Sequence, residues 1–311
     1  MAATMDQVQT LSDQAQSALD RTHLKATPGY YKRSWQRFKQ DKLALGSLIV
    51  LGVVVVFVFS APLISRLTGF TPQENHLNAK LTPMFTDGYL LGSDGNGRDI
   101  LTRLVYGGRI SLTIALISTV TTLLIGGGLG LFAGYMGRWW DSILMRFIDV
   151  LLSIPALPLL ILIATIYSPG PYQLPLVLAA VSWMGIARIV RGDVLRIKAT
   201  EYIEAARVVG VGGPRIAFKH ILPNAMPMLI VFTSLVIPGL IIAEAGLSFL
   251  GIGVQVPTPS WGNMMRDGTR YFRGYPEKVL IPGLMIYVTS LLIYMVGSGV
   301  RDAFDPRIGD Q

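Results

Sequence analysis

Few side chains in this sequence could do chemistry, and their spacing does not build a catalytic centre. His23, His76 and His220 are the only histidines, and all lie outside the long apolar runs. Asp149 has no second Asp at its depth and, three residues after Arg146, fits a helix-end ion pair. An intramembrane protease needs Ser with His, paired Asp or a His-rich zinc motif. Without cysteine, thiolate and iron–sulfur chemistry are also excluded. We therefore expect no enzyme.

Nucleotide and metal motifs are missing as well. The pattern Gly-x-x-x-x-Gly-Lys-[Ser/Thr], which cradles nucleotide phosphates, occurs nowhere, so the chain is not expected to hydrolyse ATP by itself. Asp94-x-Asn96 with Asp99 resembles part of a calcium loop, but Val105 stands where that loop needs a bidentate Glu. Turn formation explains these residues better. The sequence predicts no metal site and no cofactor in this chain.

Glu244 is the only acid deep within a long apolar run. An ionisable group at that depth must be neutralised, face water or pair with another group. Two interpretations stay open. Glu244 either lines a translocation pathway, where it would attract an ammonium group, or forms an internal hydrogen bond between helices or at the outer edge of that pathway.

The elements that must position these residues lie in lipid. Of 311 residues, 15 % are charged and 51 % hydrophobic, whereas soluble domains carry roughly 25 % charge. The apolar residues form long uncharged blocks instead of the periods of half-buried elements. The basic residues behind the net charge of +8 flank these blocks. They therefore fit lipid headgroups better than nucleic acid, whose readers gather basic residues in one patch.

The uncharged blocks predict an all-α membrane protein with six transmembrane helices. The first, 43–65, would be about 35 Å long as a helix, against a hydrocarbon core of roughly 30 Å. It exceeds the apolar core of a signal peptide, so we expect it to remain as an anchor. The other blocks cover 110–137, 150–187, 221–254 and 279–300, and the turn sequence Ser168–Tyr172 divides 150–187 into two helices.

Basic residues also predict the orientation. With the N-terminus inside, 18 of the 27 Lys and Arg fall in inner segments, so both termini are expected in the cytoplasm. Just before the first span, Tyr31, Trp35 and Phe38 share one helical face and basic residues occupy the other. Such a helix is expected to lie flat at the cytoplasmic interface.

Small residues in the second span predict close helix packing. Gly126, Gly130 and Gly134 recur every fourth position, which lets another helix approach the backbone. The alternative is that glycine is simply common in membrane helices.

The segment 188–220 carries ten charged residues and must lie outside the lipid. Thr200 is expected to N-cap a helix over 201–209, Gly210 to end it, and Gly213-Pro214 to start the next helix. A nine-residue helix is marginal alone in water, so either the rest of the chain or a partner's groove must hold it. Its residues alone do not decide between the two.

The run EYIEAARVVGVGGPRIAFKHILPNAMP resembles the EAA loop of permease subunits of binding-protein-dependent ABC importers. The matching residues are Glu204, Ala205, Ala206, Gly210, Leu222 and Pro223. His220 departs slightly from the widest form of the pattern, and the ending resembles the dipeptide/oligopeptide/nickel branch. Three further stretches resemble that branch: Leu91–Asp99 continuing to Leu112, Glu244–Gly251 with Pro257–Gly262, and Gly299–Arg307.

This resemblance implies a type I ABC importer permease fold in a prokaryotic plasma (inner) membrane. The implied partners are a second homologous permease subunit, two ABC ATPase subunits that bind ATP and Mg, and an extracytoplasmic solute-binding protein that delivers peptides. It implies that the EAA helix seats in an ATPase groove, so Glu204, Ala205, Ala206 and Gly210 would carry the coupling. A secondary transporter driven by an ion gradient is the alternative, with Glu244 as its only candidate ion site.

We expect the following organisation: a cytoplasmic tail with the interfacial helix over 1–42, the first transmembrane helix over 43–67, an extracytoplasmic segment over 68–107, a five-helix permease core over 108–303 that includes the EAA loop 188–222, and a cytoplasmic C-terminus over 304–311.

Overall fold

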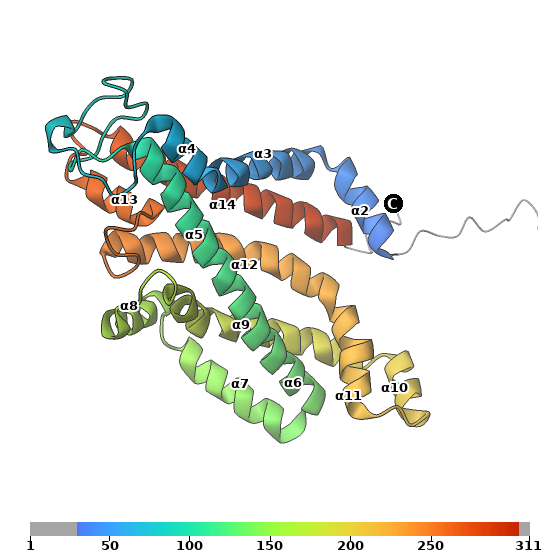
Figure 1. Ribbon diagram of the computed structural model, residues 1–311. Coiled ribbons are helices and arrows are strands. Elements are labelled where there is room, and N and C mark those ends of the chain that lie inside the picture. Colours follow the sequence, from blue (N-terminus) through green and yellow to red (C-terminus); the bar gives the residue numbers. More distant parts are fainter. Residues whose placement is uncertain (1–29, 305–311) are drawn as a thin grey trace, which may run out of the picture.

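The computed structural model describes residues 30–304, and within that range the protein is helical without a named strand. Five helical stretches are long and apolar enough to cross a membrane: Lys42–Phe59, Ile100–Met136, Leu174–Lys198, Gly213–Leu250 and Glu277–Phe304. They correspond to α3, to α5 (Ile100–Thr122) with α6 (Gly128–Met136), to α9, to α11 (Gly213–Arg215) with α12 (Leu222–Leu250), and to α14. Figure 1 shows them running between two ends of the molecule.

The third expected span is broken. Instead of one helix over 150–167, the chain forms α7 (Arg138–Leu152) and α8 (Ala156–Tyr167), bent by 85°. Pro155 explains the break, because proline lacks an N–H and pushes the preceding residue out of helical geometry. Taken together the pair makes the sixth candidate span, whereas α8 alone is too short to cross a bilayer.

Two helical stretches contain π-helical turns. The turn η2 (Leu123–Gly127) joins α5 to α6, and η3 (Ile216–Ile221) joins α11 to α12. Pro223 lies in the first turn of α12, with one residue between it and η3. A proline cannot donate the usual i→i−4 hydrogen bond, and a wider turn before it accommodates the missing donor.

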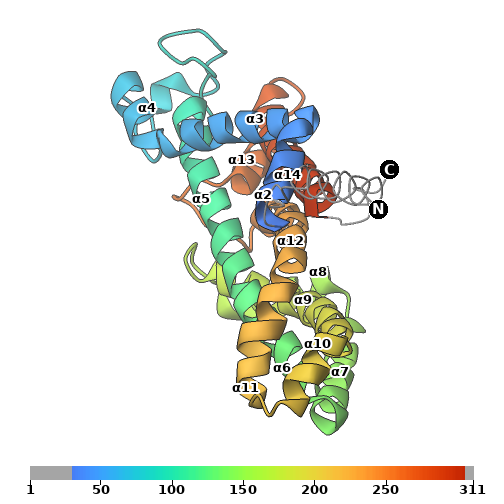
Figure 2. The same cartoon turned by 90° about the vertical axis from the view of Figure 1, so that its right-hand side faces the viewer.

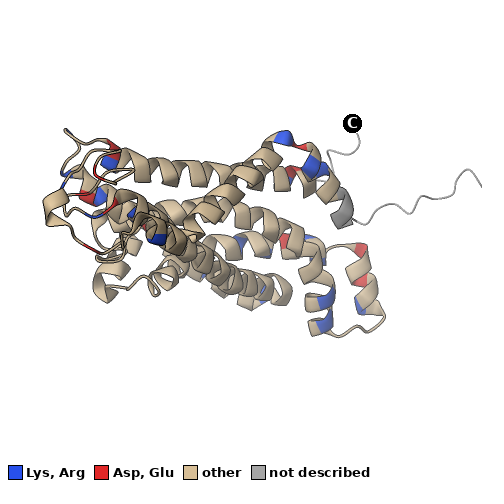
Figure 3. Ribbon diagram, turned by 45° about the horizontal axis from the view of Figure 1, so that its top comes forward, with Lys and Arg blue, Asp and Glu red and all other residues tan. Residues whose placement is uncertain are grey.

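Charged residues gather mainly at the two ends of the molecule, while the long helices between them are largely uncharged (Figure 3). We call one end the hairpin end, because α10 (Glu201–Val208) and α11 form a hairpin there (Figure 1). The other is the loop end, with α4 (Ala61–Thr68), the irregular segment 69–99 and α13 (Trp261–Thr269). In Figure 2 these two ends lie far apart.

The core is built where α5, α9 and α12 meet. Its buried residues include Ile114 of α5, Leu178 of α9 and Ile241 of α12, with Ile148 of α7 and Leu160 of α8 added from one side. A second apolar cluster lies at the hairpin end and a third at the loop end. The N-terminal α2 (Tyr30–Gln40) contacts α14 and buries Phe38, while Trp35 of the same helix stays exposed.

Candidate coupling site

The hairpin helix α10 forms close to its predicted bounds. It runs over Glu201–Val208, and Gly210 follows with a φ of +83°. That left-handed conformation suits glycine, and no atom lies within 4 Å of the position of a Cβ at Gly210. Glycine is therefore needed for backbone geometry and not for space. The turn closes with hydrogen bonds from Gly210 N to Arg207 O and from Val211 N to Ala206 O.

Thr200 precedes α10, but its side chain does not cap it as we expected. The hydroxyl donates to Ile197 O at 2.6 Å, which satisfies the last turn of α9 instead. The backbone carbonyl of Thr200 accepts from Ile203 N and Glu204 N. The short link between α9 and α10 makes the nearer acceptor available, and the hydroxyl takes it.

Ile203 anchors α10 to the rest of the chain. Ile203 is fully buried in the apolar cluster at the hairpin end, together with Ile197, Ile216 and Ile221. On the rest of the helix, Glu204 and Ala205 are exposed and Ala206 is half-buried. The sequence left open whether the chain itself or a partner holds this helix. The chain does so through Ile203, and the remaining surface is free.

The tip of the hairpin exposes apolar side chains. Val208 and Val209 are 88 % and 82 % exposed at the tip, and Tyr202 is 46 % exposed. Exposed aliphatic residues on a segment that also carries many charges form a candidate contact surface.

Leu222 and Pro223 lie at the base of the hairpin and not on this surface. Leu222 packs against the apolar cluster around Ile203, and Pro223 stands in the first turn of α12. From this position they anchor the second arm of the hairpin to α12. The residues grouped by the motif thus divide into a tip and a base.

The base of the hairpin is braced by α6 and α9. A Cβ on Gly126 would lie 2.5 Å from Trp183 O, and one on Gly130 would lie 2.5 Å from Ala187 O. Gly134 contacts Val194 in the same way. Gly130 and Gly134 of α6, with Gly126 in the turn η2 before it, line the contact with α9, where the backbones approach closely because side chains are absent.

Polar contacts complete the brace. Lys198, the last residue of α9, donates from Nζ to Tyr135 O at 2.5 Å, where α6 ends with unpaired carbonyls. Arg191 of α9 donates from Nη2 to Asp141 Oδ2 of α7 at 2.6 Å. The hairpin therefore stands on a three-helix support and not on a flexible linker.

Glu244 of α12 is completely buried within this chain. Ser111 of α5 donates to its Oε2 at 2.7 Å, and Ser248 donates to its Oε1 at 2.7 Å. The same serines also accept hydrogen bonds: Ser248 from Val254 N in the loop after α12, and Ser111 from Trp261 N at the start of α13. This is the geometry of a hydrogen bond between helices. A role for Glu244 in the pathway itself stays a prediction.

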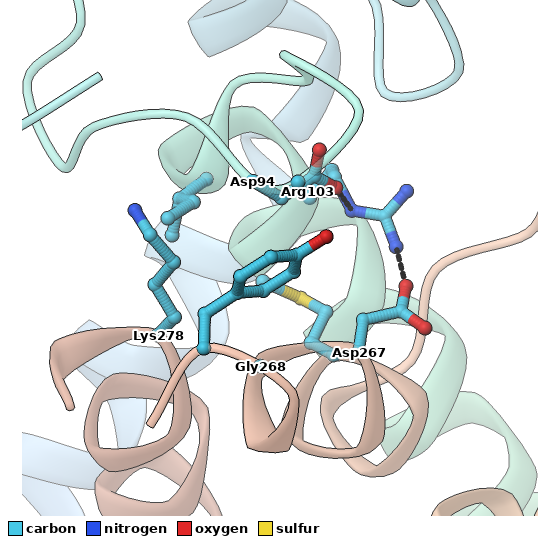
Figure 4. A pocket seen from close by; sticks show the side chains of 9 residues that line it. Asp94, Arg103, Asp267, Gly268 and Lys278 are labelled. Carbon is cyan, nitrogen blue, oxygen red and sulfur yellow. Dashed lines mark ion pairs between the residues drawn. The ribbon is translucent and has the colours of Figure 1, made fainter. Parts of the chain in front are cut away.

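The loop end contains an ion cluster that the sequence did not predict (Figure 4). Asp94 and Asp267 lie on either side of Arg98 and Arg103, with N–O distances of 2.7 to 3.6 Å. Both arginine side chains are at least nine-tenths buried. The cluster ties the loop before α5 to α13. Asp94 also accepts from Asn96 N and Arg98 N, and Asp99 caps α5 through Thr102 N, so the expected turn chemistry is present.

Two family models match this chain. Residues 126–310 match the binding-protein-dependent transport system inner membrane component, and residues 29–83 match the N-terminal transmembrane domain of oligopeptide transport permease C. The chain is 37 % identical to the oligopeptide transport system permease protein OppC of Haemophilus influenzae, over 88 % of each chain. It is 38 % identical to the dipeptide transport system permease protein DppC of Bacillus subtilis, over 90 % of this chain and 86 % of the relative.

Solved structures share the fold. An inward-facing structure of the MetNI methionine ABC transporter aligns with a TM-score of 0.54 at 23 % identity, covering 65 % of this chain and 96 % of the other. The aligned architecture agrees with the type I importer permease fold expected from the sequence.

Proposed function

Because the chain belongs to the family of binding-protein-dependent transport system inner membrane components, we propose that it forms half of a pathway for dipeptides or oligopeptides. A second permease subunit would supply the other half, and an extracytoplasmic binding protein would deliver the solute. The peptide cargo is supported by the relatives, which are oligopeptide and dipeptide permeases, and by the match to the permease C domain.

The orientation we propose places the hairpin end and both termini in the cytoplasm. The distribution of Lys and Arg supports it, with 18 of 27 on that side. The loop end, with its ion cluster, then faces the binding protein. Labelling from the two sides of the membrane tests this orientation.

The observation that carries the proposal is the exposed apolar tip of the hairpin beside Glu204 and Ala205. We propose that this tip seats in a groove of a cytosolic ATPase subunit. Ala205 and Ala206 would allow close approach, Glu204 would make a polar contact, and Gly210 would set the turn. Because Ile203 fixes α10 to the support formed by α6 and α9, a push on the tip would reach the membrane helices.

Replacement of Val208 by Asp tests the seat. Val208 is 88 % exposed, so the variant should fold, yet it places a charge in the contact. Pull-down of the ATPase subunits should drop about tenfold, in line with burial of an unpaired charge at an interface. Lys219→Ala changes another exposed hairpin residue and is the control. Undiminished ATPase recovery by Val208→Asp would contradict the proposed seat.

Uptake measurements test the energy source. Peptide uptake into proteoliposomes that hold the assembled transporter should require ATP on the hairpin side and binding protein on the loop side. It should persist when ionophores dissipate the ion gradients. Uptake that collapses with the gradients and ignores ATP would instead favour an ion-coupled mechanism.

A further inference from the structure

An ion pair joins α7 and α9 on a surface that this chain leaves open. Arg188 of α9 pairs with Asp149 of α7, and the two side chains are 48 % and 63 % exposed. The sequence favoured a pair between Asp149 and Arg146 on the same helix. In the structure, Asp149 instead pairs with Arg188 of α9, which lies 39 residues later in the chain.

The pair lies deep in the membrane region. The sequence placed all of 188–220 outside the lipid, but α9 continues as one helix from Leu174 to Lys198, so the first part of that segment belongs to the span. Trp139 and Trp140 are exposed at the start of α7, and tryptophan is enriched at the membrane interface. Asp149 follows Trp140 at roughly 14 Å along the helix axis, and Arg188 precedes the end of α9 at Lys198 by roughly 15 Å. A hydrocarbon core is about 30 Å thick. Charged side chains at that depth do not face lipid, so this surface meets water or protein.

Polar and small residues extend the surface along both helices. The exposed residues Ser142, Arg146 and Asp149 fall on one face of α7, and the exposed Ser153, which caps the helix, continues that face. On α9, the exposed Gly185 and Gly192 flank Arg188, and no atom lies within 4 Å of a Cβ built on either glycine. Room for a ligand therefore exists directly beside the guanidinium group.

Another hollow in the chain has a different character. Between α3, α5, α12 and α14 lies a space of about 500 Å³. It is lined by Leu, Val, Ile, Phe and Ala side chains, and its polar lining residues are Thr and Ser. It offers no charge to a solute. The open surface on α7 and α9 is the better match for a charged molecule within the membrane region.

We propose that the Arg188–Asp149 pair lines the aqueous pathway and binds the charged termini of a peptide in transit. This rests on the proposed function, since it takes the peptide as cargo. A peptide with free termini is a zwitterion: its ammonium group pairs with the Asp149 carboxylate and its carboxylate with the Arg188 guanidinium. An ion pair open to water is weak, so its members exchange partners readily.

Cysteine labelling tests the location, and the chain has no cysteine of its own. Ser153→Cys lies on the polar face of α7 and Val150→Cys on the neighbouring apolar face, where Val150 is 66 % exposed. In the assembled transporter in liposomes, a charged thiosulfonate should modify Ser153→Cys at least about tenfold faster, because charged reagents do not enter lipid. Peptide-loaded binding protein with ATP should slow that reaction. Equal rates, or a Ser153→Cys thiol shielded in every state by the second permease, would overturn the proposal.

Transport kinetics test the role. Asp149→Asn and Arg188→Gln should each lower the uptake rate of a free peptide by about tenfold, the usual scale for one charged contact. The affinity of the binding protein for the peptide and the recovery of ATPase subunits should not change. Val150→Ala is the control. If the wild-type assembly takes up no peptide, the proposed function fails. If it does and both charge variants match it, only this inference fails.

Discussion

Lys278, at the start of α14, donates a hydrogen bond from Nζ to the backbone oxygen of Ser93 at 2.6 Å. The two residues are 185 positions apart in the chain. Lys278 is buried, and its ammonium group also contacts Glu277 at 3.6 Å. The contact therefore fixes the loop before α5 to the last transmembrane helix.

Loss of this contact should destabilise the loop end. We expect Lys278→Met to lower the free energy of unfolding by about 1–3 kcal/mol, because Ser93 O would keep its buried position without a donor. Thermal unfolding in detergent measures the change. Lys80→Ala removes an exposed lysine from the same loop and should have little effect. Equal stability of the two variants would show that the contact contributes nothing.

The glycines of α6 should differ in their tolerance. Gly130→Ala adds a Cβ 2.5 Å from Ala187 O and should destabilise the α6–α9 contact by about 1–3 kcal/mol through overpacking. Gly128→Ala, two residues away, meets no atom within 4 Å and should gain about 0.5–1 kcal/mol from the better helix propensity of Ala. Thermal unfolding of the two variants measures this difference. If both substitutions change the free energy of unfolding in the same direction, close packing at Gly130 is contradicted.

Glu244 gives a test that separates its two interpretations. Glu244→Gln keeps the shape and most hydrogen-bonding capacity, whereas Glu244→Ala leaves Ser111 and Ser248 unpaired and should cost about 2–4 kcal/mol. If Glu244 acts only as an internal hydrogen-bond partner, Gln should preserve both stability and uptake. Uptake that falls in a Gln variant of normal stability would point to the pathway instead.

Gly210 should be replaceable only by residues that accept a left-handed backbone. With φ at +83°, we expect Gly210→Val to weaken ATPase recovery several-fold more than Gly210→Asn, since a left-handed conformation costs an ordinary L-residue about 1–2 kcal/mol and Asn adopts it more easily. Both variants have room for a side chain. If Asn and Val behave alike, a steric or chemical requirement at the seat, and not backbone conformation, governs this position.

Local patterns predicted the features that depend on neighbouring residues. The long uncharged blocks predicted the five long helices, and Gly210 predicted the end of α10, because solvation and backbone conformation act over short stretches. The ion cluster at the loop end was missed because Arg98 and Asp267 are 169 residues apart. The Asp149–Arg188 pair was missed for the same reason. Spacing along one helix pointed to Arg146, and only the packing of α7 on α9 brings Arg188 to the carboxylate.

The composition of the sequence did not predict the bend between α7 and α8. Val150–Tyr167 is long and apolar enough to read as one span, and Pro155 alone does not say how far the chain turns. A proline can kink a helix slightly or end it, and neighbouring helices decide which. Here α8 turns back to pack its buried Leu160 and Ala164 into the central core.

The helical stretch Ile100–Met136 begins beside the ion cluster and ends beside the support of the hairpin. It runs from the loop end to the hairpin end, so we expect a tilt at either tip to displace the opposite one. Its wider turn at Leu123–Gly127 is where the regular α-helical hydrogen-bond pattern changes. We therefore expect docking at one end to be transmitted to the other along this continuous helix.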